Sequence, residues 1–291
     1  VFQFPKKTIT YSMSIITLTT DFGLKDHYVA AVKGAVLKEL KNVVIVDVSH
    51  SISPFHIAEA AYIIKNAYKN FPDGTIHIIG IDSELTEENK HIALILDNHF
   101  FICANNGILS LIASEIRPTQ MVEINIHNQI QGNFPVMDVF VKVACHIARG
   151  GTLDVIGKKI TEVKQLKDFE PSINADSNQI IGNVVYIDNY GNVISNITKK
   201  LFEKVGKGRE FVINARTAKF EKVHTHYSDA INFNLPPEKR EEDGKKLALW
   251  NSSQYLELAI YKSNPTSVGG ASSLFGLEFR DAITINFKTE A

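Results

Sequence analysis

Two spacings of apolar residues alternate along the first half of the chain. Short β-branched runs at 14–20 and 43–46 are separated by segments 26–40 and 56–70, in which apolar residues recur at helical spacing. An apolar run of a few residues is typical of a strand, and a spacing of three to four residues is typical of a helix. Strands that alternate with helices in this way predict an α/β domain with a mostly parallel sheet.

The rest of this half continues the alternation. The pattern predicts further strands at 75–79, 91–97 and 100–103, the last two flanking an Asp97-Asn98 turn, and further helices at 108–115 and 136–149.

The pattern changes near residue 150. Residues 150–180 are polar and irregular, which is typical of a linker. Short β-like runs separated by turn residues follow, and they predict an all-β domain, a small barrel or sandwich. These runs are 181–187, 193–197, 210–214, 246–250, 255–260 and 282–287. We predict an α/β domain at 14–165 and a β domain at 178–291.

Composition narrows the function classes. A length of 291 residues suggests about two domains. A formal charge of −1 gives no general attraction to nucleic acid or to an anionic membrane, and no apolar segment reaches the ~18 residues of a membrane helix. We therefore expect neither nucleic acid nor a membrane as a partner.

The cysteines and the first residues bear on the compartment. Cys103 and Cys145 lie in apolar runs, which predicts buried reduced thiols, and we identify no secretory signal. These features favour a cytoplasmic protein. The residues before Ser14 form a short extension, with Met13 as an alternative start or the extension as an arm.

Three acids follow or close predicted strands. Asp21 ends the first strand, Asp47 closes the second and Asp82 ends the third. Ligands of an open parallel sheet bind at the carboxyl ends of its strands. Each acid alone is explained by a helix cap or a turn, whereas three on one edge suit a magnesium ion, a polyol or another cation. The histidines and cysteines show no spacing typical of a zinc site.

Several ordered motifs resemble one family. Ile16-Thr-Leu-Thr-Thr-Asp-Phe-Gly23 and the following Asp26-His-Tyr-Val-Ala-Ala-Val-Lys-Gly34 resemble the start of the S-adenosylmethionine hydroxide adenosyltransferases, relatives of the fluorinating and chlorinating adenosyl enzymes. The motifs that continue the resemblance are Ile45-Val-Asp-Val-Ser-His50, Gly74-Thr-Ile-His-Ile78, Asn105-Asn106-Gly107, Tyr186-Ile-Asp-Asn-Tyr-Gly-Asn192 and Leu249-Trp-Asn-Ser-Ser-Gln-Tyr-Leu-Glu-Leu-Ala259.

The resemblance implies a fold and a reaction. It implies a C-terminal domain that is barrel-like and a homotrimer with sites between subunits. The implied reaction is attack by water or halide on the 5′ carbon of S-adenosylmethionine, with methionine leaving as a neutral thioether. Because the sulfonium is already a good leaving group, the chemistry calls for positioning and desolvation of the nucleophile and for no metal or cofactor.

The resemblance also implies roles for substrate-binding residues. Asp21 grips the ribose hydroxyls, since a carboxylate accepts two hydrogen bonds from a cis-diol. The further residues that it implies are Asn192 for the nucleoside or methionine, Tyr227 stacked near adenine, and Ser252, Glu257 and the backbone of Ile260 for the adenine and amino-acid ends.

The catalytic residues depart from the family pattern. Asp82 matches the acid that orients and deprotonates water, but its arginine partner aligns with Asn89 and its histidine partner with Pro135. Lys90 replaces the arginine only as a point charge. Loss of a positioned acid–base group typically costs about 10² to 10⁴ in rate.

Two principal hypotheses follow. The first is a divergent S-adenosylmethionine hydrolase that forms adenosine and methionine, with Asp82 orienting water and Asn89 or Lys90 assisting. The second is a protein that binds a nucleoside or S-adenosylmethionine and has lost catalysis. A third, a different nucleophile or substrate in the altered loop, is left for product analysis.

Overall fold

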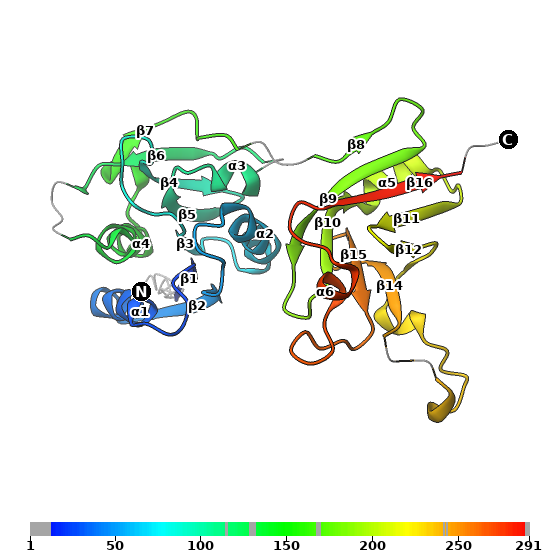
Figure 1. The fold of residues 1–291 in the computed structure, drawn as a ribbon. Helices are drawn as coiled ribbons and strands as arrows, with labels where there is room; N and C mark the ends of the chain where they lie inside the picture. Colours follow the sequence, from blue (N-terminus) through cyan, green and yellow to red (C-terminus); the bar gives the residue numbers. More distant parts are fainter. Residues whose placement is uncertain are drawn as a thin grey trace, which may run out of the picture. The chain divides into compact units, whose positions relative to one another are not determined.

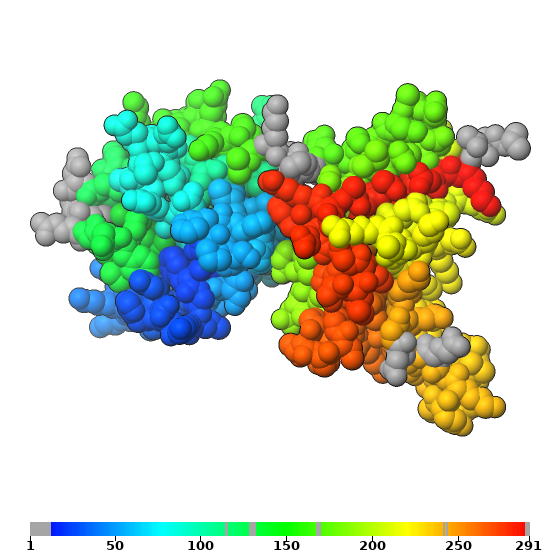
Figure 2. Space-filling model, in the orientation of Figure 1, coloured from blue at the N-terminus to red at the C-terminus, as the bar shows by residue number. Residues whose placement is uncertain are grey.

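The structure is a computed structural model that describes residues 13–113, 116–127, 132–166, 170–240, 242 and 244–288. The chain divides into two compact units, Val1–Lys167 and Asp168–Ala291 (Figures 1 and 2). Each unit is described separately below. None of the helices in the described ranges has the length and apolar composition that crossing a membrane requires.

The first unit alternates strands and helices, as its apolar pattern predicts. Its elements are β1 (Ser14–Thr20), α1 (Tyr28–Glu39), β2 (Val43–Ser49), α2 (Ile57–Ala67), η1 (Tyr68–Asn70), β3 (Ile76–Gly80), β4 (His91–Leu96), β5 (His99–Ala104), α3 (Ile108–Ile112), β6 (Gln120–Ile124), the π-helical η3 (Val136–Phe140), α4 (Val141–Ala148), η4 (Leu153–Val155) and β7 (Gly157–Lys159).

The sheet of this unit is mixed, so the expectation of a mostly parallel sheet needs correction. Its strand order is β2-β1-β3-β5-β4-β6-β7. The pairs β1–β2, β1–β3 and β3–β5 are parallel, whereas β4–β5, β4–β6 and β6–β7 are antiparallel. Asp97 and Asn98 have φ values of 50° and 61°. A two-residue loop with both φ values positive closes a tight hairpin, and it reverses the chain between β4 and β5.

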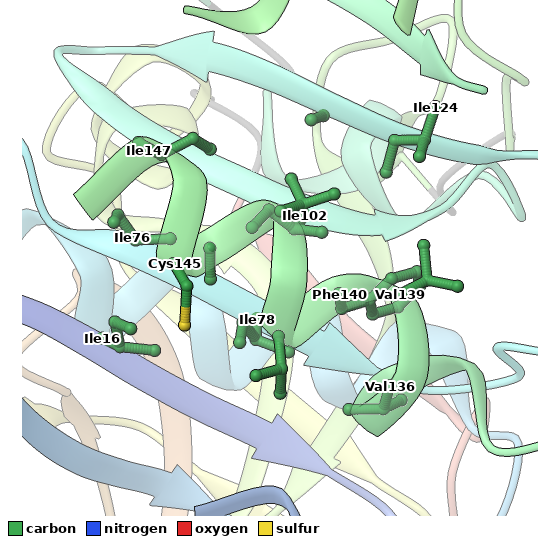
Figure 3. Close-up of a cluster of buried hydrophobic side chains, with 14 of the residues drawn as sticks. Ile16, Ile76, Ile78, Ile102, Ile124, Val136, Val139, Phe140, Cys145 and Ile147 are labelled. Atoms are coloured by element: carbon green, nitrogen blue, oxygen red, sulfur yellow. The ribbon is translucent and has the colours of Figure 1, made fainter. Parts of the chain in front are cut away.

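Helices cover both faces of this sheet. Side chains of α1 and α4 share one apolar cluster with Ile16, Ile78 and Ile102, and α2 and α3 share another with Ile79 and Phe101. Figure 3 shows the first cluster, in which the thiol of Cys145 from α4 points to the strands. Cys103 and Cys145 are both buried and free, as predicted.

The second unit is built on one long, curled sheet. Its elements are β8 (Ser172–Ile173), β9 (Gln179–Ile187), β10 (Val193–Thr198), α5 (Lys199–Gly206), β11 (Phe211–Ala215), β12 (Ala218–Phe220), β13 (Val223–His224), η5 (Tyr227–Ala230), η6 (Pro237–Lys239), β14 (Lys246–Trp250), β15 (Tyr255–Ile260), α6 (Ala271–Phe275) and β16 (Ala282–Phe287).

The sheet order is β12-β11-β16-β9-β10-β15-β14-β13, with β8 paired to β9, and it gives a barrel-like body (Figure 1). The prediction of an all-β domain is wrong in one respect, because α5 and α6 belong to it. Helix α5 forms because Thr198 caps it by accepting a hydrogen bond from the backbone N–H of Leu201, and because Val205 packs into the core.

The polar stretch 150–180 is more structured than a linker. It carries η4 and β7 of the first unit and β8 of the second, and Leu153 and Ile156 are buried in the core of the first unit. Among its described apolar residues, Leu153, Ile156 and Ile180 are buried in the cores of the two units, whereas Val155 and Ile173 are exposed.

Candidate functional site

The carboxyl edge of the first sheet gathers the candidate residues of that unit. Strands β1 and β3 are parallel neighbours, with Thr20 opposite Gly80. Asp21 directly follows β1 and Asp82 comes two residues after β3. Both predicted acids therefore lie at the edge where an open sheet binds ligands.

The reversed strands bring further residues to the same edge. Because β4 is antiparallel to β5, it starts where β3 and β5 end, with His91 as its first residue. Because β6 is antiparallel to β4, it ends at this edge, and His127 follows three residues after it. Sequence reasoning missed both histidines.

One backbone hydrogen bond restrains the carboxylate of Asp21. Its Oδ2 accepts a hydrogen bond of 2.8 Å from the backbone N–H of Phe55. Phe55 has a φ of 61°, an unusual conformation for a bulky residue. The half-buried carboxylate is thus held in one orientation at the edge.

His50 holds the turn that contains Asp21. Its Nδ1 lies 2.7 Å from Thr20 Oγ1, and its backbone carbonyl accepts a hydrogen bond of 2.8 Å from Gly23. Thr20 and Gly23 flank Asp21 on both sides. His50 is 4% exposed, so the contact is shielded from water.

Asp47 supports this histidine. It lies inside β2, and its carboxylate is 2.5 Å from Lys33 Nζ and 3.1 Å from His50 Nε2. Burial raises the pKa of Asp47, but the hydrogen bonds with Lys33 and His50 outweigh it and leave the pKa below its ordinary value. Within the described ranges no three His, Cys, Asp or Glu side chains are grouped as metal ligands, so the cation site proposed for Asp21, Asp47 and Asp82 finds no support.

Asp82 adopts a left-handed backbone conformation with a φ of 43°. The carbonyl before it, of Ile81, accepts a hydrogen bond of 2.9 Å from Asn106 Nδ2. Asn89 Nδ2 donates to the carbonyls of Asp82 (2.8 Å) and Glu84 (3.0 Å). The surroundings thus enforce a conformation that would otherwise be unfavourable.

The two residues predicted to assist Asp82 differ in their surroundings. The amide nitrogen of Asn89 is bound to the loop carbonyls, so this side chain braces the loop. Lys90 is half-buried, and its charge is close enough to His127 to lower the pKa of that histidine. Pro135 precedes η3 with a helical φ of −54° and starts the helical segment.

His91 and His127 form a hydrogen-bonded pair beside the Asp82 turn. His91 Nε2 lies 2.9 Å from the carbonyl oxygen of Ser83, and His91 Nδ1 lies 2.9 Å from His127 Nε2. Burial lowers the pKa of His91 to about 4, opposed by the bond to Ser83. Burial also lowers the pKa of His127. Both rings are therefore neutral at pH 7.

In the second unit, Glu257 is the centre of a polar cluster. Its carboxylate is 3% exposed and accepts a hydrogen bond of 2.5 Å from the hydroxyl of Tyr227. Asn192 and Asn251 also hydrogen-bond to it. Burial raises the pKa of Glu257, and the charge of Asp188 adds to this rise. The structure thus brings together three predicted residues, Asn192, Tyr227 and Glu257.

Asp188 is a member of this cluster that sequence reasoning missed. It accepts hydrogen bonds from the backbone N–H groups of Tyr190 and Asn192, each 2.8 Å, and from Asn192 Nδ2 at 3.0 Å. An Asp that begins a turn ending in Gly191 is a recognisable signal for such contacts. Asp188 and Glu257 together give the cluster a strongly acidic character.

The last two predicted residues lie at opposite ends of the β15 segment. Ser252 is exposed in the turn before the strand, and Ile260 is its final residue. The side chain of Ile260 is buried in the core, and its carbonyl accepts a hydrogen bond of 3.2 Å from Ser263.

Fold and sequence together place the chain in a class of two-domain proteins that join an α/β unit to a barrel-like unit. The family model of the SAM hydroxide adenosyltransferase N-terminal domain matches residues 16–157, and that of the C-terminal domain matches residues 182–284. The chain belongs to the S-adenosylmethionine hydroxide adenosyltransferase family, as its motifs predict.

Named relatives come from two branches of this family. An (R)-S-adenosyl-L-methionine hydrolase of Methanocaldococcus jannaschii is 26% identical over 290 residues, covering 94% of this chain and 96% of its own. A fluorinase of Nocardia brasiliensis is 25% identical, covering 67% of this chain and 74% of its own.

Solved structures show the same fold. A crystal structure of an uncharacterized conserved protein from Thermotoga maritima matches with a TM-score of 0.78 and 25% identity, covering 94% of this chain and 99% of its own. A conserved hypothetical protein from Thermus thermophilus matches with a TM-score of 0.68 and 20% identity, covering 95% of this chain and 100% of its own.

Proposed function

We propose that this protein hydrolyses S-adenosylmethionine to adenosine and methionine. The observation that carries the proposal is the restrained left-handed turn of Asp82, at the same sheet edge as Asp21. The hydrolase of M. jannaschii, similar along nearly the whole chain, supports this reaction within the family.

The reaction balances with one water molecule. The water oxygen forms a bond to the 5′ carbon while the bond from that carbon to sulfur breaks. The electron pair stays on sulfur, which makes methionine a neutral thioether. Asp82 orients the water and accepts its proton, which then passes to solvent. Asn89 assists by bracing the loop, and Lys90 by its charge.

Substrate binding is assigned to the remaining residues. Asp21 accepts hydrogen bonds from the ribose diol. Asn192, Tyr227, Ser252, Glu257 and the backbone of Ile260 hold the adenine and amino-acid ends. The ammonium group at the amino-acid end of the substrate is attracted to acidic side chains, which agrees with the presence of Asp188 and Glu257 in the cluster.

The proposed reaction needs no metal or cofactor, because methionine leaves from the sulfonium without protonation. The family resemblance favours a homotrimer with sites at subunit interfaces. The two buried thiols favour a cytoplasmic setting, and the charge of −1 favours a small-molecule substrate over a nucleic acid.

A second candidate is a binding protein that has lost catalysis. The observation that favours it is the replacement of two catalytic partners, since Pro135 has no titratable group and the amide of Asn89 is bound to loop carbonyls.

Asp82→Asn tests the hydrolase. Adenosine formed from S-adenosylmethionine is measured by chromatography, and we expect the rate to fall about 10² to 10⁴-fold, because the water loses its proton acceptor. Glu87→Gln, an exposed acid of the same loop, is the matched control and keeps the wild-type rate.

Three results distinguish the alternatives. Equal adenosine formation by Asp82→Asn and the wild-type protein contradicts the role of Asp82. Tight binding of adenosine or S-adenosylmethionine by calorimetry, without turnover, supports the binding protein. A halogenated nucleoside among the products points to another nucleophile.

A further inference from the structure

The histidine pair beside Asp82 has a defined arrangement of protons. A carbonyl oxygen only accepts hydrogen bonds, so His91 Nε2, 2.9 Å from the carbonyl of Ser83, carries a hydrogen. In a neutral ring, Nδ1 of His91 then has a lone pair. His127 Nε2, 2.9 Å away, must donate to it, which leaves the lone pair of His127 on Nδ1.

The surroundings keep this arrangement in place. His91 is 1% exposed, and its ring packs edge-on against Phe140 with centroids 4.8 Å apart. The charged groups that act on His127 are Glu123, which favours its protonation, and Lys90, which opposes it. A proton added to His91 Nδ1 would meet the N–H of His127, so the pair opposes protonation of His91.

The pair completes the restraint of the Asp82 turn. The four successive carbonyls of residues 81–84 all accept side-chain hydrogen bonds: Asn106 binds the first, Asn89 the second and fourth, and His91 the third. His91 therefore holds the peptide group between Ser83 and Glu84, the next one after the Asp82–Ser83 peptide that Asn89 holds. A non-glycine residue with φ of 43° persists only where its surroundings over-determine it.

We propose that His91, oriented by His127, is a positioning residue that holds Asp82 in line for the attack of water on the 5′ carbon. This inference rests on the proposed hydrolysis and deepens it. His91 acts through the Ser83 carbonyl, and His127 acts through His91. Positioning by this pair partly compensates for the family's arginine and histidine, which are replaced here by Asn89 and Pro135.

Substitutions of His91 provide the kinetic test. His91→Phe keeps the ring volume and removes the donor to Ser83. We expect kcat to fall about 10- to 100-fold, because small misplacements of a reacting group cost rates of this order, and KM to stay within about twofold. His91→Gln keeps an amide N–H near the position of Nε2 and should recover most of the loss. His127→Phe should lower kcat less than His91→Phe.

His99→Phe is the matched control. His99 is also a buried histidine bound to another histidine, with 3.1 Å between its Nδ1 and His77 Nε2, but it starts β5 at the opposite edge of the sheet. If His91 has a merely structural role, His91→Phe and His99→Phe will show the same kcat once activity is compared at equal folded fraction. That result would overturn the inference.

The protonation of the two histidines can be measured by spectroscopy, independently of enzymatic activity. Nitrogen-15 imidazole spectra of the full chain at pH 7 should show His91 and His127 as neutral rings protonated on Nε2. Protonation of His91 on Nδ1 would overturn the inference. Adenosine production that is unchanged in His91→Phe overturns it alone, whereas absence of adenosine with wild-type protein overturns it together with the proposed hydrolysis.

Discussion

Thr20 and His50 set the position of the carboxylate next to them. The Thr20 hydroxyl and the Gly23 backbone both bind His50, and Asp21 lies between them. Since the contact between Thr20 and His50 is buried, water does not replace it without a cost. The orientation of the proposed ribose ligand thus depends on residues that do not touch the ribose.

Thr20→Val tests this dependence. The substitution keeps the shape but leaves His50 Nδ1 buried without its partner, which should cost about 1–3 kcal/mol of stability. We expect adenosine to bind roughly tenfold more weakly by calorimetry, which corresponds to about 1.4 kcal/mol. Thr20→Ser keeps the hydroxyl and should bind adenosine as the wild type does; equal weakening in both variants contradicts the role of the hydroxyl.

The location of a residue at the sheet edge was predicted correctly where its position in the sequence alone determines it. Asp21 and Asp82 follow strands, so the sheet itself brings them to one edge. The contact between His91 and His127 could not be predicted from the sequence, because it depends on β4 and β6 being antiparallel neighbours. Asp188 lay within a motif quoted from the sequence, but its contacts depend on the turn that it begins.

At the scale of elements, Gly80 allows β3 to pack closely at the site. A Cβ atom at this position would lie 2.8 Å from Val136 Cγ2 and 3.2 Å from Thr20 Cγ2. Neither neighbour is the free end of a long side chain. Gly80 therefore lets the η3 segment approach the end of β3, two residues before Asp82.

Gly80→Ala should destabilise the protein by about 1–3 kcal/mol, since overpacking forces side chains and backbone to shift. Gly34→Ala is the matched control, because a Cβ there meets nothing within 4 Å in helix α1. We expect it to stabilise the protein by about 0.4–1 kcal/mol. Urea unfolding measures both, and equal stability of the two variants contradicts the packing argument.

Long periodic elements were predicted well, and short ones were not. The helices of the first unit and strands β9, β10, β11, β14, β15 and β16 follow clear apolar spacing. Strand β6 was missed, and so were β7, β8, β12 and β13, which have two or three residues each and acquire their structure from their neighbours. Helix α5 carried a readable signal in the Thr198 cap that the pattern analysis did not use.

At the scale of the whole molecule, acid acts in opposite directions on two buried histidines of the first unit and on the buried Glu257 of the second. In the first unit, burial lowers the pKa of His77 to about 3 and that of His91 to about 4. The unfolded chain binds protons at these sites first, so their contribution to stability is complete above about pH 6.5 and is lost as pH falls. In the second unit, burial raises the pKa of Glu257, so its native state gains protons first and gains stability as pH falls.

Mild acid should therefore unfold the first unit before the second. Trp250, the single tryptophan of the chain, lies in β14 of the second unit. Between about pH 6.5 and 4.5, urea unfolding followed by circular dichroism should develop an early transition that tryptophan fluorescence does not report. His77→Phe should weaken this pH dependence. Coincident transitions at every pH contradict the prediction.

The reversed direction of β4 keeps the whole connection between β3 and β4 at one edge of the sheet. A crossover to a parallel strand would carry the chain to the far edge of the sheet and back. Here the chain leaves β3 and enters β4 at the same edge, so the segment 81–90 begins and ends beside the proposed substrate. Engineered grafting within this segment should therefore exchange the groups around the proposed nucleophile without changing the strand register or the apolar layers of the sheet.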